Sequence, residues 1–272
     1  MYQRTEVKET FVKQTETITR TRKRAANPDL VEAFRAAGVR EGLWRRGDRF
    51  FHYCKHQLFR GIDFRGKTML DVGCGDGLFM IWAAANGAGS VVGLEPLADG
   101  SGTSKRVAHI LYAMSESLGL KNVSRLPYTF QEYDCRGQKH DIVLLHASIN
   151  HLDEQMCVEL QNSPEAQKVY TEIFRKLRGV MRKNGKLIIV DASNRNFYRL
   201  LGFKKNPVNP RLTWHNHQAP EFWADMLEQT GFGARKISWL SNAQLGPLGF
   251  VLRNRLMAYF TESAFRLEMT AL

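Results

Sequence analysis

From residue 67 onward, short apolar runs alternate with amphipathic segments, and no other feature of the sequence limits the fold as strongly. Residues 67–73, 90–96 and 140–148 are predicted strands, and the segments 78–86 and 104–119 repeat apolar residues at helical spacing. Strands that are apolar throughout are typical of a sheet that is buried on both faces. The alternation therefore predicts an α/β fold with a parallel sheet covered by helices.

The same pattern continues toward the C-terminus. A helix at 167–182 is predicted to end at Asn184 and Gly185, before a strand at 186–191. One more helix and two final strands are expected at 220–232, 234–241 and 264–269.

A glycine-rich loop, in the sequence LDVGCGDGLF at residues 70–79, follows the first strand. Gly73, Gly75 and Gly77 lack a Cβ, so a ligand can approach the backbone closely and the chain can turn tightly. The loop leads into a helix N-terminus, whose free N–H groups favour a carboxylate or phosphate. In open parallel sheets, ligands bind beyond the carboxyl ends of the strands. The loop therefore predicts a site for a small anionic or zwitterionic group.

An acidic residue, Glu95, ends the second strand and lies 18 residues after Gly77. A carboxylate in this place can accept hydrogen bonds from both hydroxyls of a ribose, which predicts a nucleoside-containing cofactor. Dinucleotide sites use Gly-x-Gly-x-x-Gly, whereas this chain has Gly-x-Gly-x-Gly preceded by Asp71. The tighter spacing suits an amino-acid tail better than a pyrophosphate.

Together with the segments HDIVLLHASINHL and RGVMRKNGKLIIVD, these motifs resemble the class I S-adenosylmethionine-dependent methyltransferases over residues 45–240. The resemblance implies a Rossmann-like, doubly wound sheet of seven strands in the order 3-2-1-4-5-7-6, with the last strand antiparallel and helices on both faces. It also implies an enzyme whose cofactor is S-adenosylmethionine and whose product is S-adenosylhomocysteine.

The resemblance assigns Asp71 and the three loop glycines to the methionine portion of the cofactor and Glu95 to its ribose. The acidic residue that usually meets the adenine amine has no single counterpart here, and Gln131 or Glu132 can take its place. His146 and Ala147 are expected to flank the cofactor. The full predicted cofactor site is Asp71, Gly73, Cys74, Gly75, Asp76, Gly77, Glu95, Pro96, Gln131, Glu132, His146 and Ala147.

Four histidines are candidate catalytic residues, because a hydroxyl acceptor needs a base whose pKa lies near neutrality. His146 and His151 follow the fourth strand, and His215 and His217 lie in the sequence TWHNHQAP before a helix. Each can instead cap a helix or fill a polar pocket. Asp191 is interpreted as a residue that ends a strand rather than as a base. We expect no metal, because no cysteine lies near the last two histidines and a third ligand is not apparent.

The flanks of the core are basic. Residues 1–67 carry 16 Lys and Arg against 8 Asp and Glu, and residues 195–272 carry 10 against 5, whereas the middle of the chain is nearly neutral. This division indicates an anionic partner, which can be nucleic acid, a membrane surface or an acidic small molecule, or else a merely solvated surface.

The chain is expected to divide into a basic N-terminal tail and helical cap over 1–66 and a cofactor-binding core over 67–272. In the first part, Pro28 and Gly38 are expected to begin and end a helix. In the second, the apolar, basic segment 246–260 is expected to be an inserted helix. It can be a lid, a dimer face, a hydrophobic wall for a lipid-like acceptor, or plain core. The segment 44–59, rich in Arg and aromatic residues, is interpreted as a lid rather than an RNA-stacking surface.

Three functions stay open. The favoured one is methyl transfer to an oxygen of a small organic, sugar or lipid-linked acceptor, with peripheral membrane contact possible. An RNA methyltransferase is the second, motivated by the basic flanks, and a non-catalytic cofactor-binding subunit is the third. The four cysteines form no Cys-x-x-Cys pair, the first two dozen residues lack a signal-peptide core, and no apolar run could cross a bilayer. We therefore expect a cytoplasmic protein with reduced thiols.

Overall fold

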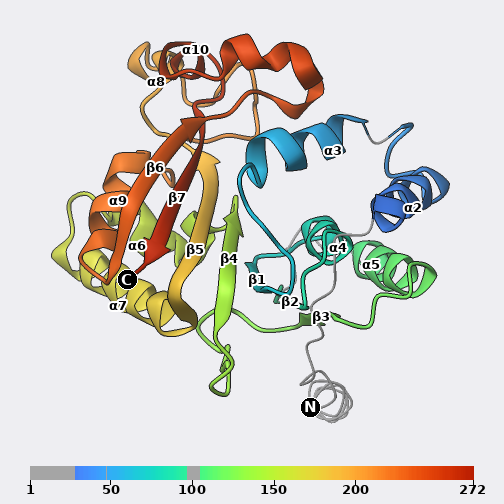
Figure 1. The fold of residues 1–272 in the computed structure, drawn as a ribbon. Helices are drawn as coiled ribbons and strands as arrows, with labels where there is room; N and C mark the ends of the chain where they lie inside the picture. The colour runs from blue at the N-terminus through green and yellow to red at the C-terminus, as the bar shows by residue number, and fades with distance from the viewer. Residues whose placement is uncertain (1–27, 47, 97–104) are drawn as a thin grey trace. The chain divides into compact units, whose positions relative to one another are not determined.

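The structure is a computed structural model that describes residues 28–46, 48–96 and 105–272. The predicted tail over 1–27 lies outside these residues. One seven-stranded sheet has the order β3-β2-β1-β4-β5-β7-β6, which confirms the predicted fold class (Figure 1). The strands are β1 (Thr68–Val72), β2 (Ser90–Leu94), β3 (Val123–Leu126), β4 (His140–His146), β5 (Met181–Ala192), β6 (Phe232–Trp239) and β7 (Ala264–Ala271).

The described residues form two compact units: one lies within residues 1–45 and 63–128, and the other lies within residues 46–62 and 129–272. The expected boundary between a cap over 1–66 and a core over 67–272 stays a prediction. Among the described residues, no helix combines the length and the apolar character needed to cross a membrane.

In the first unit, β1, β2 and β3 are parallel. The unit also contains α2 (Pro28–Arg40), α4 (Leu78–Ala85) and α5 (Lys105–Ser117). Helix α4 is apolar on all sides and lies almost wholly in the core. Its packing on β2 is close, because a Cβ on Gly93 would lie 2.4 Å from the sulfur of Met80 and 2.7 Å from that of Cys74.

In the second unit, β4 and β5 are parallel, and β7 runs antiparallel to both of its neighbours, β5 and β6. Its main helices are α7 (Pro164–Gly179) and α9 (Pro220–Glu228). They meet through the buried rings of Tyr170, Phe174 and Trp223, with Trp223 centred 5.4 Å and 5.9 Å from the other two. This cluster is the aromatic centre of the core of the unit.

Several short helices connect these elements in the second unit. The segment that was expected to be one inserted helix at 246–260 contains two short helices, joined through the side chain of Asn254, which caps the second one by accepting from the backbone N–H of Met257. The short helices are α3 (Asp48–Tyr53), η2 (Cys54–Leu58), η3 (Ile149–His151), α6 (Glu154–Glu159), α8 (Phe197–Leu200), η4 (Ala243–Leu252) and α10 (Arg255–Tyr259).

The predicted end of the helix at Asn184 and Gly185 was wrong. Helix α7 ends at Gly179, and β5 begins at Met181. The N–H of His140 donates to the carbonyl of Val180 at 2.8 Å, so pairing with β4 draws the chain into the sheet before the Asn-Gly pair. Asn184, with a φ of 63°, lies instead in an irregular stretch of β5 where the register with β4 shifts.

Candidate functional site

In the first unit, the glycine loop is a tight turn at the carboxyl end of β1. Gly73, Gly75 and Gly77 have φ values of 75°, 51° and 73°, a region that glycine enters without strain. The N–H groups of Gly73 and Cys74 donate to the carbonyl of Leu94 at 2.9 Å and 3.0 Å, which fixes the loop beside the end of β2. A Cβ added at Gly75 would meet no atom within 4 Å, so this part of the loop faces open space.

The carboxyl group of Asp71 is buried directly below this loop. Its side chain is 1% exposed, and neither oxygen has a hydrogen-bond partner among the described residues. Burial, helped by the charges of Asp76 and Glu95, raises the pKa of Asp71 to about 8. A buried, unpaired carboxyl group is costly, so this position fits a site that a ligand with a cationic group completes.

The carboxylate of Glu95 faces the same loop. One of its oxygens accepts a hydrogen bond from the N–H of Gly75 at 2.9 Å, and the residue is 9% exposed. Asp76 accepts from the N–H of Leu78 and so covers the start of α4. Cys74 is buried and Pro96 is half-buried beside them. An acidic side chain held against an open glycine loop fits a ligand that carries hydroxyl groups.

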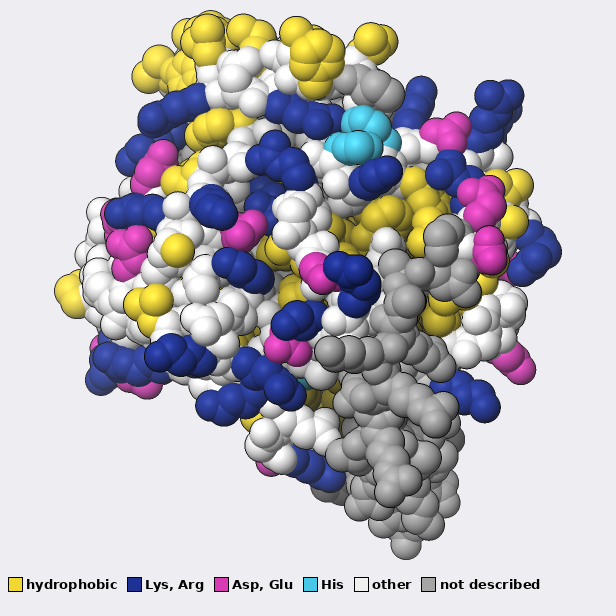
Figure 2. All heavy atoms as spheres, in the orientation of Figure 1, with side chains coloured by type: hydrophobic (Ala, Val, Ile, Leu, Met, Phe, Trp, Pro, Cys, Tyr) yellow, Lys and Arg dark blue, Asp and Glu magenta, His cyan; other side chains and the backbone are white. Residues whose placement is uncertain are grey.

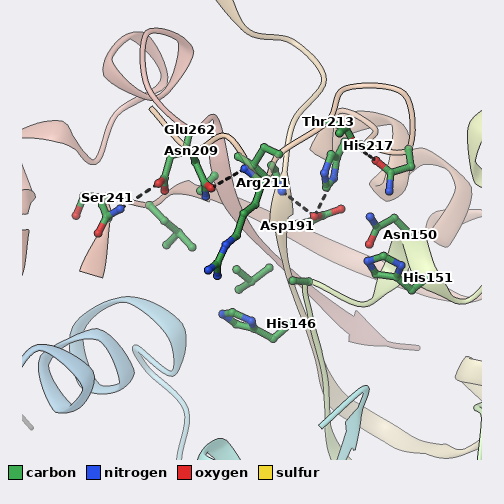
Figure 3. Close-up of a pocket in the computed structure, with 18 of the residues that line it drawn as sticks. His146, Asn150, His151, Asp191, Asn209, Arg211, Thr213, His217, Ser241 and Glu262 are labelled. Carbon is green, nitrogen blue, oxygen red and sulfur yellow. Dashed lines mark hydrogen bonds and ion pairs between the residues drawn. The ribbon is translucent and has the colours of Figure 1, made fainter. Parts of the chain in front are cut away.

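In the second unit, a pocket of about 520 Å³ lies at the carboxyl ends of β4 and β5 (Figure 3). The polar side chains in its wall come from α3, β4, η3, β5 and the loops before α9, η4 and β7. They include Tyr53, His146, Asn150, His151, Asp191, Arg211, His217 and Glu262.

Asp191 and His217 form the most buried polar pair of this pocket. Nδ1 of His217 lies 3.1 Å from Oδ1 of Asp191, off the line of an ideal hydrogen bond, and the two side chains are 9% and 2% exposed (Figure 3). The same Oδ1 accepts from the N–H of Ala192 at 2.8 Å, whereas Oδ2 has no hydrogen-bond partner within the described part of the chain. The carboxylate and the imidazole therefore lie side by side in the buried part of the pocket wall.

His146, the last residue of β4, has a different partner. Its Nε2 lies 2.8 Å from the hydroxyl of Tyr53, which ends α3. Burial lowers the pKa of His146 to about 4, although the charge of Asp191 partly opposes this shift. Burial also raises the pKa of Tyr53. At neutral pH, a neutral imidazole therefore faces a neutral phenol, and His146 is a weak base.

The other two candidate histidines are exposed. His151 lines the pocket, but its Nδ1 lies 2.6 Å from the carboxylate of Glu154 one turn later. His215 is exposed and is not part of the pocket wall. The structure thus brings His146, His151 and His217 together and leaves His215 outside.

The residues predicted to meet the adenine are held by local contacts. The side chain of Glu132 accepts from the N–H and the hydroxyl of Thr129, and Gln131 donates to the carbonyl of Leu152. Ala147 lines the pocket with a φ of 52°, which is unusual for a residue with a Cβ and is the kind of backbone strain that gathers at functional sites. The roles of these three residues stay predictions.

Sequence reasoning missed Tyr53, Asn150, Arg211 and Glu262 as pocket residues. Tyr53 lies in the segment that was interpreted as a lid, so its aromatic and basic composition was a usable signal. Arg211 extends across the pocket on the side of His146 (Figure 3). It comes from an irregular loop, which has no periodicity to predict where a side chain points.

Comparison with known proteins agrees with this architecture. Residues 44–237 match the family described as Methyltransferase domain. A tRNA U34 carboxymethyltransferase of Ectopseudomonas mendocina is 34% identical over 90 residues, which cover 33% of this chain and only 26% of that relative.

Two solved structures share the fold. One is a provisionally assigned S-adenosylmethionine-dependent methyltransferase of Listeria monocytogenes, with 15% identity, a TM-score of 0.53 and coverage of 81% of this chain and 98% of that one. The other is a SAM-dependent methyltransferase of Thermotoga maritima, with 16% identity, a TM-score of 0.50 and coverage of 89% and 99%. The family match, the strand order and the glycine loop lead to one assignment: the chain belongs to the methyltransferase-domain family and is a class I enzyme that uses S-adenosylmethionine.

Proposed function

We propose that the enzyme methylates an oxygen atom of a small polar acceptor that binds in the pocket at the ends of β4 and β5. The observation that carries the proposal is the buried Asp191–His217 pair in the pocket wall. A volume of about 520 Å³ lies within the range of small-molecule sites and is too small to enclose a folded RNA element.

The first unit offers a fitting cofactor site. Asp71 and the loop glycines would hold the methionine portion, and Glu95 would hold the ribose. The unpaired carboxyl group of Asp71, the open space at Gly75 and the position of Glu95 against the loop support this assignment. The cofactor supplies an electrophilic methyl group on a sulfonium. The protein therefore has to bind both reactants, align them and exclude water, an effect worth up to about 7–11 kcal/mol.

Within the pocket, His217 is proposed as the general base that removes the proton of the acceptor hydroxyl. Asp191 orients the ring and balances the charge that the ring gains. His146 is a poor base at neutral pH because its pKa is about 4. We infer that His146 and Tyr53 position the acceptor through hydrogen bonds, and that Arg211 favours an acceptor with an anionic group.

An RNA methyltransferase is the second candidate. The partial likeness to a tRNA-modifying enzyme and the basic flanks favour it. RNA binding through phosphate contacts would weaken steeply as salt concentration rises, whereas binding of a small acceptor in a pocket would change little. A non-catalytic subunit is the third candidate, and the oriented histidine argues against it.

Transfer of labelled methyl groups from S-adenosylmethionine into a cell extract tests the proposal. The extract is afterwards separated into RNA, lipid and small-molecule fractions. We expect label in the small-molecule or lipid fraction. Label in RNA alone would overturn the proposed acceptor class, and no label in any fraction despite measurable cofactor binding would favour the non-catalytic subunit.

A further inference from the structure

The second unit carries an exposed apolar surface that the pocket does not use. Of the 13 large exposed hydrophobic side chains among the described residues, nine lie between residues 200 and 260. Hydrophobic atoms gather at the top of the view in Figure 2, where Figure 1 shows α8 and α10. We name eight of these nine side chains the apolar cap: Leu200, Leu201, Phe203, Leu248, Phe250, Val251, Leu256 and Phe260. Single exposed hydrophobic residues are ordinary, but a cluster of this kind marks a contact surface.

The apolar cap stands on a packed base. The ring of Phe197 lies 4.9 Å from that of Phe260, which joins α8 to the end of α10. The amide of Asn196 donates to the carbonyl of Thr261 at 2.8 Å and strengthens the same junction. The amide of Asn254 donates to the carbonyl of Val251 at 2.9 Å, which joins η4 to α10. The cap therefore belongs to the folded unit, and its outermost side chains, Leu248 at 78% and Leu200 at 75% exposure, have no core to fill.

The two segments that carry the apolar cap contain basic residues and no acidic ones, although Glu221 and Glu262 directly follow them. Residues 192–220 contain five Lys and Arg, residues 240–261 contain two, and neither segment contains Asp or Glu. Lys204 and Lys205 are exposed, and Arg255 is exposed although it also lies 3.9 Å from Glu221. Lys and Arg side chains form a band directly below the apolar atoms in Figure 2. An apolar tip with a basic rim matches the layers of an anionic membrane surface, where acyl chains lie beneath phosphates.

We propose that the apolar cap inserts into the interfacial layer of an anionic lipid bilayer and that the surrounding Lys and Arg side chains contact the phosphates of the headgroups. A second copy of the chain is a poorer fit, because an isologous contact between two caps would bring two basic rims together. RNA is also a poorer fit, because five of the eight cap side chains, with Leu248 and Leu200 the most exposed, are aliphatic, and the polar backbone of RNA offers them no apolar partner.

The docking surface also shares its segments with the pocket. Asn209, Arg211 and Leu212 follow the first cap segment, and Leu240, Ser241 and Asn242 precede the second. The nature of the acceptor is the one step that rests on the proposed function. If that function holds, an enzyme docked in this way methylates an acceptor that is itself held in or at the bilayer.

Sedimentation of the full-length protein with lipid vesicles tests the docking surface, in the absence of cofactor and acceptor. One set of vesicles contains equal parts of phosphatidylcholine and phosphatidylglycerol, and the other contains phosphatidylcholine alone. We expect at least about tenfold tighter binding to the mixed vesicles, because several basic residues contact anionic lipid, and weaker binding as salt rises.

The double variant Leu248→Glu, Phe250→Glu should reduce binding to the mixed vesicles at least tenfold. The matched control is Val158→Glu, a change on α6 at a residue that is 46% exposed and lies outside the apolar cap, and it should bind as the unchanged protein does. Circular dichroism and cofactor binding verify that both variants fold.

The proposal is overturned if the unchanged protein binds neither kind of vesicle, or if the double variant binds as well as the control. Gel filtration gives a further test. The proposal is also overturned if the unchanged protein and the control are dimers, the double variant is a monomer, and all three bind vesicles equally well. Vesicle binding needs no methyl transfer, so a failure of the proposed function would leave this result intact.

Discussion

The pairing of Asp191 with His217 leads to a specific prediction for the variant His217→Gln. The glutamine keeps a hydrogen-bond donor beside the buried carboxylate of Asp191, so the charge keeps a polar neighbour, but the amide cannot take a proton. General base catalysis contributes about 10²–10⁴-fold, which corresponds to about 2.7–5.5 kcal/mol of activation free energy. We therefore expect the rate of methyl transfer to fall at least 100-fold.

The assay is transfer of labelled methyl groups to the extract fraction that accepts them. The affinity for S-adenosylmethionine, measured by calorimetry, should stay within about twofold, because the residue is not in the glycine loop. His215→Gln is the matched control: it changes an exposed histidine two positions away and should leave the rate unchanged.

The reasoning would be refuted if His217→Gln kept more than a third of the activity. It would also be refuted if His215→Gln lost as much activity as His217→Gln. A variant that lost cofactor affinity and thermal stability together with activity would assign His217 a structural role.

Three further predictions concern the first unit. Glu95→Ala should weaken cofactor binding about 10–100-fold in calorimetry, since a charged hydrogen bond contributes about 1.5–3 kcal/mol; an unchanged affinity would contradict the assigned role. The pKa of Asp71 is raised to about 8 in the fold, so between pH 4 and 8 the unfolded chain releases this proton while the folded protein keeps it. The free energy of unfolding of the cofactor-free protein should therefore fall as pH rises through this window, and Asp71→Asn should flatten that dependence in denaturant titrations. Gly93→Ala should destabilise the protein by about 1–3 kcal/mol, because its Cβ would clash with Met80 and Cys74, whereas Gly179→Ala, which meets nothing within 4 Å, should not; equal unfolding midpoints would disprove the close packing.

The features that could be predicted from the sequence are those encoded by neighbouring residues. Asp71, the loop glycines and Glu95 stand at fixed distances from two strand ends, so the strand pattern predicts that they lie close together, as they do in the structure. The fold follows for the same reason, because each strand and each long helix has its own local periodicity.

The features that could not be predicted depend on contacts between distant segments. Tyr53 and His146 are 93 residues apart, and nothing local to either residue predicts the other as its partner. The four candidate histidines look alike in the sequence. The folded chain distinguishes them, because His217 is buried beside Asp191 in the pocket wall, whereas His215 is exposed outside it. The early end of α7 has the same origin, since the hydrogen bond from His140 to Val180 overrides the Asn-Gly signal.

The position of β7 also has a consequence for the order in which the molecule assembles. This strand is the last of the seven along the chain, yet it lies between β5 and β6. Until the ribosome has released β7, β6 has no neighbour to pair with and β5 keeps an open edge. The β7 side chains Phe265, Leu267 and Met269 are completely buried in the finished fold. The second unit therefore completes its core only after synthesis of residue 271, and a nascent chain that stalls before that point exposes an unpaired, apolar edge to aggregation.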